Sequence, residues 1–238
     1  MKILEVEGIR KNFGGLAAVA GVDFSVDQGE VVGLIGPNGA GKTTLFNLIS
    51  GAITPTAGTT RFKGMDITRL KPYEICRHGI ARTFQLVKLF NDMTVIENVL
   101  LAHLFRQSTC TQDDAIRQCQ ELLDFVGLLG LEGTPAQDLT IAKQKRLEVA
   151  RALATQPELL LLDEVMAGLN PAEVEEAIAL IKKIQEMGIT ILMVEHVMKA
   201  IMDVSERVIV LHNGEKIADG TPEDIAAHPT VIEVYLGG

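Results

Sequence analysis

A glycine-rich segment, residues 36–43, constrains what this chain can fold into more than any other feature of its sequence. It matches the pattern G-x-x-x-x-G-K-[ST], in which backbone amides surround phosphate groups while the lysine and the hydroxyl complete the site. The apolar run before it, residues 31–35, is typical of a buried strand, and residues 44–49 after it continue as a helix. A chance glycine-rich turn is the alternative, but strand, loop and helix in this order predict a site for a nucleoside triphosphate.

Each part of the segment has a physical role in holding phosphate. Glycine allows backbone conformations closed to other residues and a close approach to the anion. The helix that begins there points unpaired N–H groups and the positive end of its dipole at the ligand. We expect Lys42 to reach the β- and γ-phosphates and Thr43 to ligate Mg²⁺. The predicted nucleotide-binding residues in and after the segment are Gly36, Pro37, Asn38, Gly39, Ala40, Gly41, Lys42, Thr43 and Thr44.

Length and composition limit the architecture and the partners. A chain of 238 residues can bury one large core or two modest ones. Its formal net charge of −9, without a basic tract, argues against a nucleic-acid partner whose phosphates it would have to neutralise. No signal sequence is recognisable and no apolar run reaches the roughly 18 residues that span a bilayer, so we expect a chain that is soluble by itself and intracellular. Cys76, Cys110 and Cys119 have no C-x-x-C spacing and predict neither a disulfide framework nor a zinc site.

The first part of the chain predicts strands followed by helices. Turn residues after Phe13 and after Asp27 divide a β-rich N-terminal region, and Gly79 stops a short helix. A T-x-x-E capping box begins a helix at Thr94, and apolar residues then recur at helical spacing. The expected elements are strands within 3–26, at 59–62 and at 81–85, and helices at 72–78, 94–103 and 111–129.

The second part alternates helices with apolar strands. Residues 159–162 are apolar on both faces, as a central parallel strand covered by helices on both sides must be. The pattern predicts an α/β fold with a mostly parallel core sheet, an N-terminal antiparallel β region and an inserted helical subdomain. We place that subdomain at 86–133 and the catalytic core at 1–85 and 134–238 of a single domain. The remaining expected elements are helices at 140–156, at 171–187 and after Thr221, and strands at 189–194, 208–211 and 216–218.

Two acids follow the apolar strand 159–162. Asp163 and Glu164 therefore lie at its carboxyl end, the edge at which open α/β sheets bind ligands. There Asp163 is able to hold Mg²⁺ and Glu164 to polarise a water in line with the γ-phosphate, which is the division of roles that phosphoryl transfer requires. An acidic pair that merely ends a strand in solvent is the alternative. The phosphate loop upstream favours the catalytic interpretation.

In these motifs and in their order the chain resembles the ATP-binding-cassette ATPases, and the resemblance covers nearly all of it. It implies ATP and Mg²⁺ as ligands. By the same resemblance Phe13 stacks on adenine, Gln85 senses Mg²⁺ or the attacking water, and His196 contacts the γ-phosphate. Taken singly, each of these three has an ordinary structural explanation. The implied catalytic residues are Lys42, Gln85, Glu164 and His196, and the implied metal-binding residues are Thr43, Gln85 and Asp163.

The family's L-S-G-G-Q segment is the point at which the resemblance weakens. Residues 139–143 stand in its place and keep only the first residue. Thr140 keeps a hydroxyl that is able to cap the following helix, whereas Ala142 adds a methyl group where glycine would let phosphate approach. We expect a slowed but working site, with Lys143 compensating in part. The residues implied to contact the ATP of a partner subunit are Leu139, Thr140, Ile141, Ala142 and Lys143.

The sequence that follows this segment, with K-R-L-E-V-A-R-A-L-A at 145–154, resembles the ATPases of importers for branched-chain amino acids and related amides. The resemblance then implies a second ATPase subunit, identical or related, with two ATP molecules held between them. It also implies membrane permease subunits, an extracytoplasmic solute-binding protein acting through them, and a peripheral location on the cytoplasmic face of the membrane. Residues 86–98 are where the family meets its permease, although Leu86, Val87, Leu89 and Phe90 would pack internally in an alternative interpretation.

Other functions remain open on the sequence. A regulatory module of the same fold would bind ATP and hardly hydrolyse it, which the altered segment at 139–143 favours and the intact Glu164 and His196 oppose. A cytosolic cassette protein of translation or repair would typically carry two cassettes or a long insert. A small-molecule kinase would not explain the ordered Gln85, 139–143 and His196.

Overall fold

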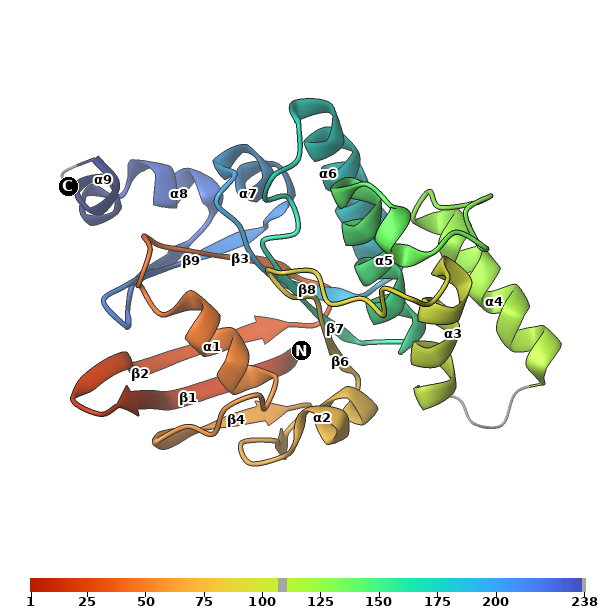
Figure 1. The fold of residues 1–238 in the computed structure, drawn as a ribbon. Helices are drawn as coiled ribbons and strands as arrows, with labels where there is room; N and C mark the ends of the chain where they lie inside the picture. Colours follow the sequence, from red (N-terminus) through yellow and green to blue (C-terminus); the bar gives the residue numbers. More distant parts are fainter. Residues whose placement is uncertain (107–110, 237–238) are drawn as a thin grey trace.

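Two β-sheets and their covering helices make up the fold, which the computed structural model describes for residues 1–106 and 111–236 (Figure 1). One sheet is antiparallel, with the strand order β2-β1-β4-β5, and the other has the order β10-β9-β3-β8-β7-β6. In the second sheet the strands from β9 to β6 run parallel, and β10 pairs antiparallel with β9. The strands are β1 (Lys2–Phe13), β2 (Leu16–Asp27), β3 (Val31–Ile35), β4 (Ala57–Phe62), β5 (Met65–Asp66), β6 (Ile80–Arg82), β7 (Leu159–Asp163), β8 (Thr190–Val194), β9 (Arg207–His212) and β10 (Glu215–Gly220).

The helices fall into separate groups around the parallel sheet. Helices α3, α4 and α5 lie together at one end of the molecule, opposite the antiparallel sheet (Figure 1). Among the described helices, none combines the length and the apolar character that crossing a bilayer requires. The helices are α1 (Lys42–Ile49), α2 (Pro72–His78), α3 (Val95–Arg106), α4 (Gln112–Phe125), α5 (Ile141–Ala154), α6 (Pro171–Glu186), α7 (Met198–Val204), α8 (Pro222–Ala227) and α9 (Pro229–Leu236), with a short 3₁₀ turn at Ala136–Asp138.

The parallel sheet is buried on both faces, and β7 shows why its sequence is apolar throughout. Successive side chains of a strand point to opposite faces. Leu159 and Leu161 therefore enter a core shared with α1 and the antiparallel sheet, whereas Leu160 and Leu162 enter a core shared with α5 and α6. Helix α1 is thus enclosed between the two sheets, and this fixes the loop from which it starts.

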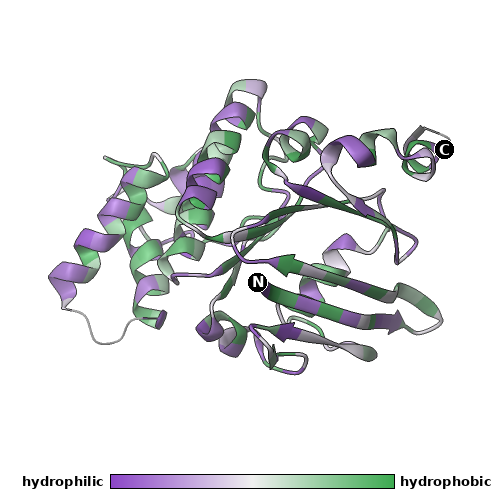
Figure 2. Ribbon diagram, turned by 180° about the vertical axis from the view of Figure 1, so that it is seen from behind, coloured by the Kyte–Doolittle hydropathy of each residue, from purple (hydrophilic) through white to green (hydrophobic). Residues whose placement is uncertain are grey.

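The helical end of the molecule shares the second of these cores. Val99 of α3, Cys119 of α4 and Leu147 of α5 belong to the same buried cluster as Leu160 of the sheet. Helix α4 buries only one stripe of residues and is mainly hydrophilic outside, as Figure 2 shows at the outer edge of this helical group. One continuous core therefore joins the helices to the sheet.

The predicted α/β fold is confirmed, and two of its predicted elements end about three to four residues earlier than expected. The strand predicted at 81–85 ends at Arg82, because the chain turns out of the sheet there while Thr83 still donates its N–H to the carbonyl of Leu161. The helix predicted at 111–129 ends at Phe125. Gly127 takes a φ of 75° and Leu128 donates back to the carbonyl of Leu123, which closes the helix.

Two short helices, α7 and α9, were not predicted. Both have few residues, and α7 lacks a side-chain cap, so their sequences carry little helical signal. Among the three cysteines, Cys110 lies outside the described residues.

Removing a large side chain from the core around α1 is expected to cost far more stability than removing an exposed one. Phe62 is 1% exposed and lies opposite Leu4 in the antiparallel sheet, whereas Phe13 is 50% exposed. The change Phe62→Ala should lower the free energy of unfolding by about 3–5 kcal/mol, and Phe13→Ala in the nucleotide-free protein by less than about 1 kcal/mol. Urea unfolding followed by circular dichroism measures both. Equal losses of unfolding free energy in the two variants would contradict the enclosed position of Phe62 in this core.

Candidate functional site

The chemically reactive residues gather at the carboxyl edge of the parallel sheet. Strand β3 leads into the glycine-rich loop, β7 ends in Asp163 and Glu164, and β8 is followed by His196. Parallel strands end at the same edge, so segments far apart in sequence meet there. A cleft of about 600 Å³ opens at this edge, and its lining includes Phe13, Asn38, Gly39, Ala40, Gly41, Lys42, Thr43, Thr44, Gln85, Glu164 and His196.

Close backbone packing fixes the loop at residues 36–43. Gly36 has a φ of 152° and Gly41 a φ of 102°. A Cβ atom would lie 2.2 Å from the carbonyl oxygen of Leu211 at Gly36 and 2.5 Å from that of Ala18 at Gly41. Glycine is therefore required at both positions by conformation and by space. The neighbouring strands β9 and β2 hold the loop in shape.

Lys42 lies buried beneath the loop. Its ammonium group donates to the carbonyl oxygens of Gly36, at 2.6 Å, and of Pro37, at 3.0 Å. Burial lowers the pKa of Lys42, and the negative charges of Glu164 and Asp163 oppose that shift. These two bonds hold the ammonium group against the backbone of the loop.

Glu164 is held on both carboxylate oxygens. Gln85 donates its side-chain N–H to Oε2 at 2.9 Å, and the Nε2 atom of His196 lies 2.9 Å from Oε1. The backbone of Glu164 has a φ of 51°, a conformation that residues other than glycine rarely adopt. Its N–H donates to Val194, and its carbonyl accepts from the ammonium of Lys145 at 2.8 Å. These bonds hold the carboxylate toward the cleft in an otherwise unfavourable conformation.

Asp163 lies one residue earlier and is buried beneath the cleft. Its Oδ2 atom pairs with the guanidinium of Arg82 at 2.8 Å, and both side chains are buried. Its backbone N–H donates to the hydroxyl of Thr83, whereas its Oδ1 atom has no hydrogen-bond partner. The sequence interpretation missed Arg82, although an arginine in an apolar strand is a signal for a buried partner.

A second group of charges lies buried behind Glu164. Lys145 of α5 and Glu195, which directly follows β8, are both buried, and Glu195 accepts a hydrogen bond from the backbone of Met166 at 2.8 Å. Burial raises the pKa of Glu195 to about 7, against the opposing effects of that hydrogen bond and of Lys145. Sequence reasoning also missed this pair, because burial of a charged residue leaves no periodic signal.

Residues 139–143 lie away from the cleft in which the other predicted site residues gather. Thr140 caps α5 by accepting from the backbone N–H of Lys143 at 3.4 Å. Leu139 is buried, while Thr140, Ile141 and Lys143 are exposed, and none of these five residues lines the cleft. Within one chain they form a separate surface at the beginning of α5.

The order of strand, phosphate loop and helix, with Asp163 and Glu164 at the same edge of the sheet, defines the class of protein as a P-loop ATPase domain. Residues 19–167 match the family model for the ABC transporter, and residues 215–238 match that for the branched-chain amino acid ATP-binding cassette transporter. The chain therefore belongs to the ABC transporter family, as an ATPase. The resemblance that the motifs indicated is confirmed.

Relatives of known name match this chain almost end to end. The high-affinity branched-chain amino acid transport ATP-binding protein BraF of Pseudomonas aeruginosa is 43% identical over 252 residues, which cover 99% of this chain and 98% of that protein. The protein named LivG in Escherichia coli K12, with the same description, is 43% identical over 249 residues, with coverage of 99% and 98%.

Solved structures of similar proteins share the whole fold. The ADP conformation of MJ1267, an ATP-binding cassette of an ABC transporter, superposes with a TM-score of 0.90 at 33% identity and covers 100% of both chains. A dimeric post-hydrolysis state of the cassette MJ0796, bound to ADP and Pi, has a TM-score of 0.84 at 26% identity and covers 92% of this chain and 98% of that one. Nucleotide binding is thus a property of the structural relatives.

The raised pKa of Glu195 predicts a dependence of stability on pH. Because the pKa is about 7 in the folded chain and 4.5 is its ordinary value, the folded state holds the proton more strongly. The resulting stability is complete below pH 4.5 and is lost as the pH rises through about 7. Relative to Glu195→Gln, the wild type should therefore lose stability between these values and level off above them.

Urea unfolding of both proteins at a series of pH values measures this difference. Subtracting the two curves removes the other groups that titrate in the same range. Parallel curves would mean that Glu195 ionises equally in the folded and unfolded states.

Proposed function

We propose that this chain hydrolyses ATP as one of two paired ATPase subunits of an importer for branched-chain amino acids or related amides. The observation that carries the proposal is the single cleft that joins the phosphate loop to Gln85, Glu164 and His196. The names of the relatives favour this class of solute. The intact acidic and histidine residues favour turnover over the alternative, a regulatory module that binds ATP with little hydrolysis.

In this proposal Glu164 takes the proton from the attacking water. The water oxygen bonds to the γ-phosphorus while the bond to the β-phosphate oxygen breaks and ADP leaves. The bonds from Gln85 and His196 orient the two oxygens of the carboxylate, so little reorganisation is needed during the reaction. Lys42 exchanges its carbonyl partners for phosphate oxygens and neutralises their charge. Phe13, exposed at the rim of the cleft, offers an aromatic face to the adenine.

The residues proposed to hold Mg²⁺ are Thr43, Gln85 and Asp163. The buried Oδ1 atom of Asp163 lacks a hydrogen-bond partner, which suits it to accept from water bound to a metal ion. In the described part of the chain no cluster of three or more His, Cys, Asp or Glu side chains suits a metal ion. The ion would therefore be held together with phosphate oxygens, whose charge it would neutralise when bound.

The segment at 139–143 is proposed to complete the site of a second subunit. The exposed N-terminus of α5 provides unpaired amides and a positive dipole end for the γ-phosphate of the partner's ATP. Ala142 and the charge of Lys143 alter this surface, so we expect slowed turnover. The dimeric arrangement of a similar cassette supports pairing of two subunits.

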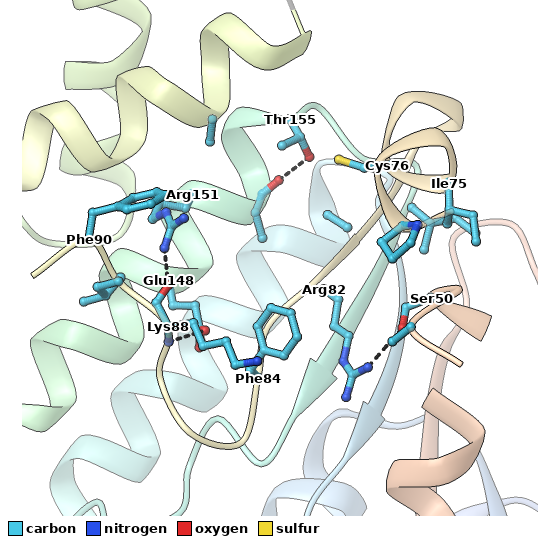
Figure 3. Close-up of a pocket in the computed structure, with 17 residues that line it drawn as sticks. Ser50, Ile75, Cys76, Arg82, Phe84, Lys88, Phe90, Glu148, Arg151 and Thr155 are labelled. Atoms are coloured by element: carbon cyan, nitrogen blue, oxygen red, sulfur yellow. Dashed lines mark hydrogen bonds between the residues drawn. The ribbon is translucent and has the colours of Figure 1, made fainter. Parts of the chain in front are cut away.

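A groove beside the helical end is the proposed docking site for the membrane permease. We call it the docking groove; it holds about 480 Å³, and its lining includes Arg82, Phe84, Lys88, Phe90, Glu148 and Arg151 (Figure 3). Leu86 is 81% exposed and Phe90 is 44% exposed, which favours docking over internal packing for these two residues, whereas Leu89 packs against the core. We propose that residues 86–98, at the start of the helical subdomain, meet the permease.

Docking would hold the chain at the cytoplasmic face of the membrane. Closure of the two ATPase subunits around ATP would move the permease subunits, and an extracytoplasmic binding protein would deliver the solute. In this arrangement the ATPase chain itself does not touch the solute.

The change Glu164→Gln should separate the enzyme from the regulatory module. Removing the proton acceptor is expected to lower phosphate release by roughly 100-fold or more while ATP binding persists. Phosphate release and nucleotide binding should be measured with the membrane subunits present. The control is Glu158→Gln, which removes an exposed carboxylate that pairs with Lys63. Equal, near-zero turnover in wild type and Glu164→Gln would favour the regulatory module and would also refute a working segment at 139–143.

The docking groove predicts a separate phenotype for Phe90→Asp. The new charge should weaken co-purification with the permease and reduce solute uptake, because it places a carboxylate in the proposed interface. Phosphate release by the isolated chain should stay unchanged. The control is Leu129→Asp, which charges a still more exposed apolar residue outside the groove. Uptake that survives Phe90→Asp would count against this docking site.

A further inference from the structure

Arg82 joins three elements of the site through its guanidinium group. At the end of β6 it donates to Oδ2 of Asp163 at 2.8 Å. It also donates to the side-chain oxygen of Asn47 at 2.6 Å and to the hydroxyl of Ser50 at 3.0 Å, of which the second bond is drawn in Figure 3. Asn47 belongs to α1 and Ser50 is its C-cap. The side chain therefore connects the strand β7 to the helix that begins at the phosphate loop.

Aromatic rings on two sides restrict this guanidinium further. The centre of its charge lies 5.7 Å from the ring of Phe46 on α1 and 5.1 Å from the ring of Phe84. With its side chain 8% exposed, little water competes for its hydrogen bonds. Planar, charge-assisted bonds of this kind fix geometry as well as charge. The guanidinium of Arg82 is thus held in place between β7 and α1.

The hydrogen bonds of Arg82 determine which carboxylate oxygen of Asp163 is left for a bound ion. Arg82 occupies Oδ2, which leaves Oδ1 as the buried oxygen without a partner. Helix α1 begins with Lys42 and Thr43, so the bond from Arg82 to Asn47 ties the carboxylate to the element that carries Thr43. The spacing between Thr43 and Asp163 is therefore set through a residue that touches neither phosphate nor metal.

We propose that Arg82 is a positioning residue that holds Asp163 and Thr43 at the spacing needed for Mg²⁺ with bound nucleotide. This inference rests on the proposed role of Asp163 and Thr43 in holding that ion. It assigns to Arg82, Asn47 and Ser50 a function in the use of Mg²⁺ that is distinct from their contribution to stability.

The test compares nucleotide affinity with and without Mg²⁺ in the isolated full-length chain. Calorimetric titration with a non-hydrolysable imido analogue of ATP, once with MgCl₂ and once with EDTA, gives the factor by which Mg²⁺ tightens binding. We expect Arg82→Gln to reduce this factor roughly tenfold, the size expected for lost hydrogen bonds to a charged group. Arg82→Lys keeps the positive charge but loses the planar set of N–H donors, so its Mg²⁺ factor should lie between those of the wild type and Arg82→Gln. Affinity in EDTA should change less than about twofold.

Two further variants separate positioning from simple stability. Asn47→Ala leaves the pair of Arg82 with Asp163 intact but removes the tie to α1, and it should also reduce the Mg²⁺ factor. Arg207→Gln is the control, because Arg207 also connects separate segments through its guanidinium, pairing with Glu30 and Asp219 away from the cleft. It should lower the thermal midpoint without changing the Mg²⁺ factor.

The variant Asp163→Asn distinguishes failure of this inference from failure of the proposed function. If Asp163→Asn loses the Mg²⁺ factor while Arg82→Gln and Asn47→Ala keep it, Arg82 contributes stability alone and the inference is overturned. If Asp163→Asn keeps the full factor, the metal role of Asp163 is wrong, and the inference falls with it. Should Arg82→Gln not fold, Asn47→Ala and Arg82→Lys decide the matter.

Discussion

Ionisable side chains buried at one edge of the parallel sheet are the constraint on which the rest of the structure depends. Lys42, Asp163 and Glu164 all lie beneath or within the cleft, where removal from water is costly for each charge. Every one of them has fixed polar partners: backbone carbonyls for the lysine, an arginine for the aspartate, an amide and an imidazole for the glutamate. Such partners, supplied by segments far apart in the sequence, tie those segments to a single geometry.

Packing on both faces of the sheet supplies the rigidity that these partners need. Helix α1 is enclosed between two sheets, and α5 and α6 cover the opposite face. The phosphate loop cannot shift without disturbing Gly36 and Gly41, whose backbones pack against the carbonyls of Leu211 and Ala18. The loop that we propose to hold phosphate is preorganised in this way, and preorganised donors are a main source of electrostatic stabilisation in catalysis.

Local patterns in the sequence predicted most of the fold. The phosphate loop, the capping residue Thr140 and the helix from Pro72 to His78 each carry their signal within a few neighbouring residues. The early end of β6 has no such signal, because it depends on where the chain must turn to bring Gln85 to Glu164. The pair of Arg82 and Asp163 spans 81 residues. No periodicity reports a contact of that separation, and the same holds for Lys145 behind Glu164.

The docking groove is linked to Asp163 through a single side chain, Arg82. Arg82 and Ser50 line the groove, while the other side of the same guanidinium holds Asp163. A substitution that adapted this part of the groove to a different membrane protein would at the same time remove the partner of a buried carboxylate. In the proposed docking role, the groove can therefore be altered around Phe90 without unpairing Asp163, whereas a change at Arg82, on the wall next to α1, alters the groove and the site together.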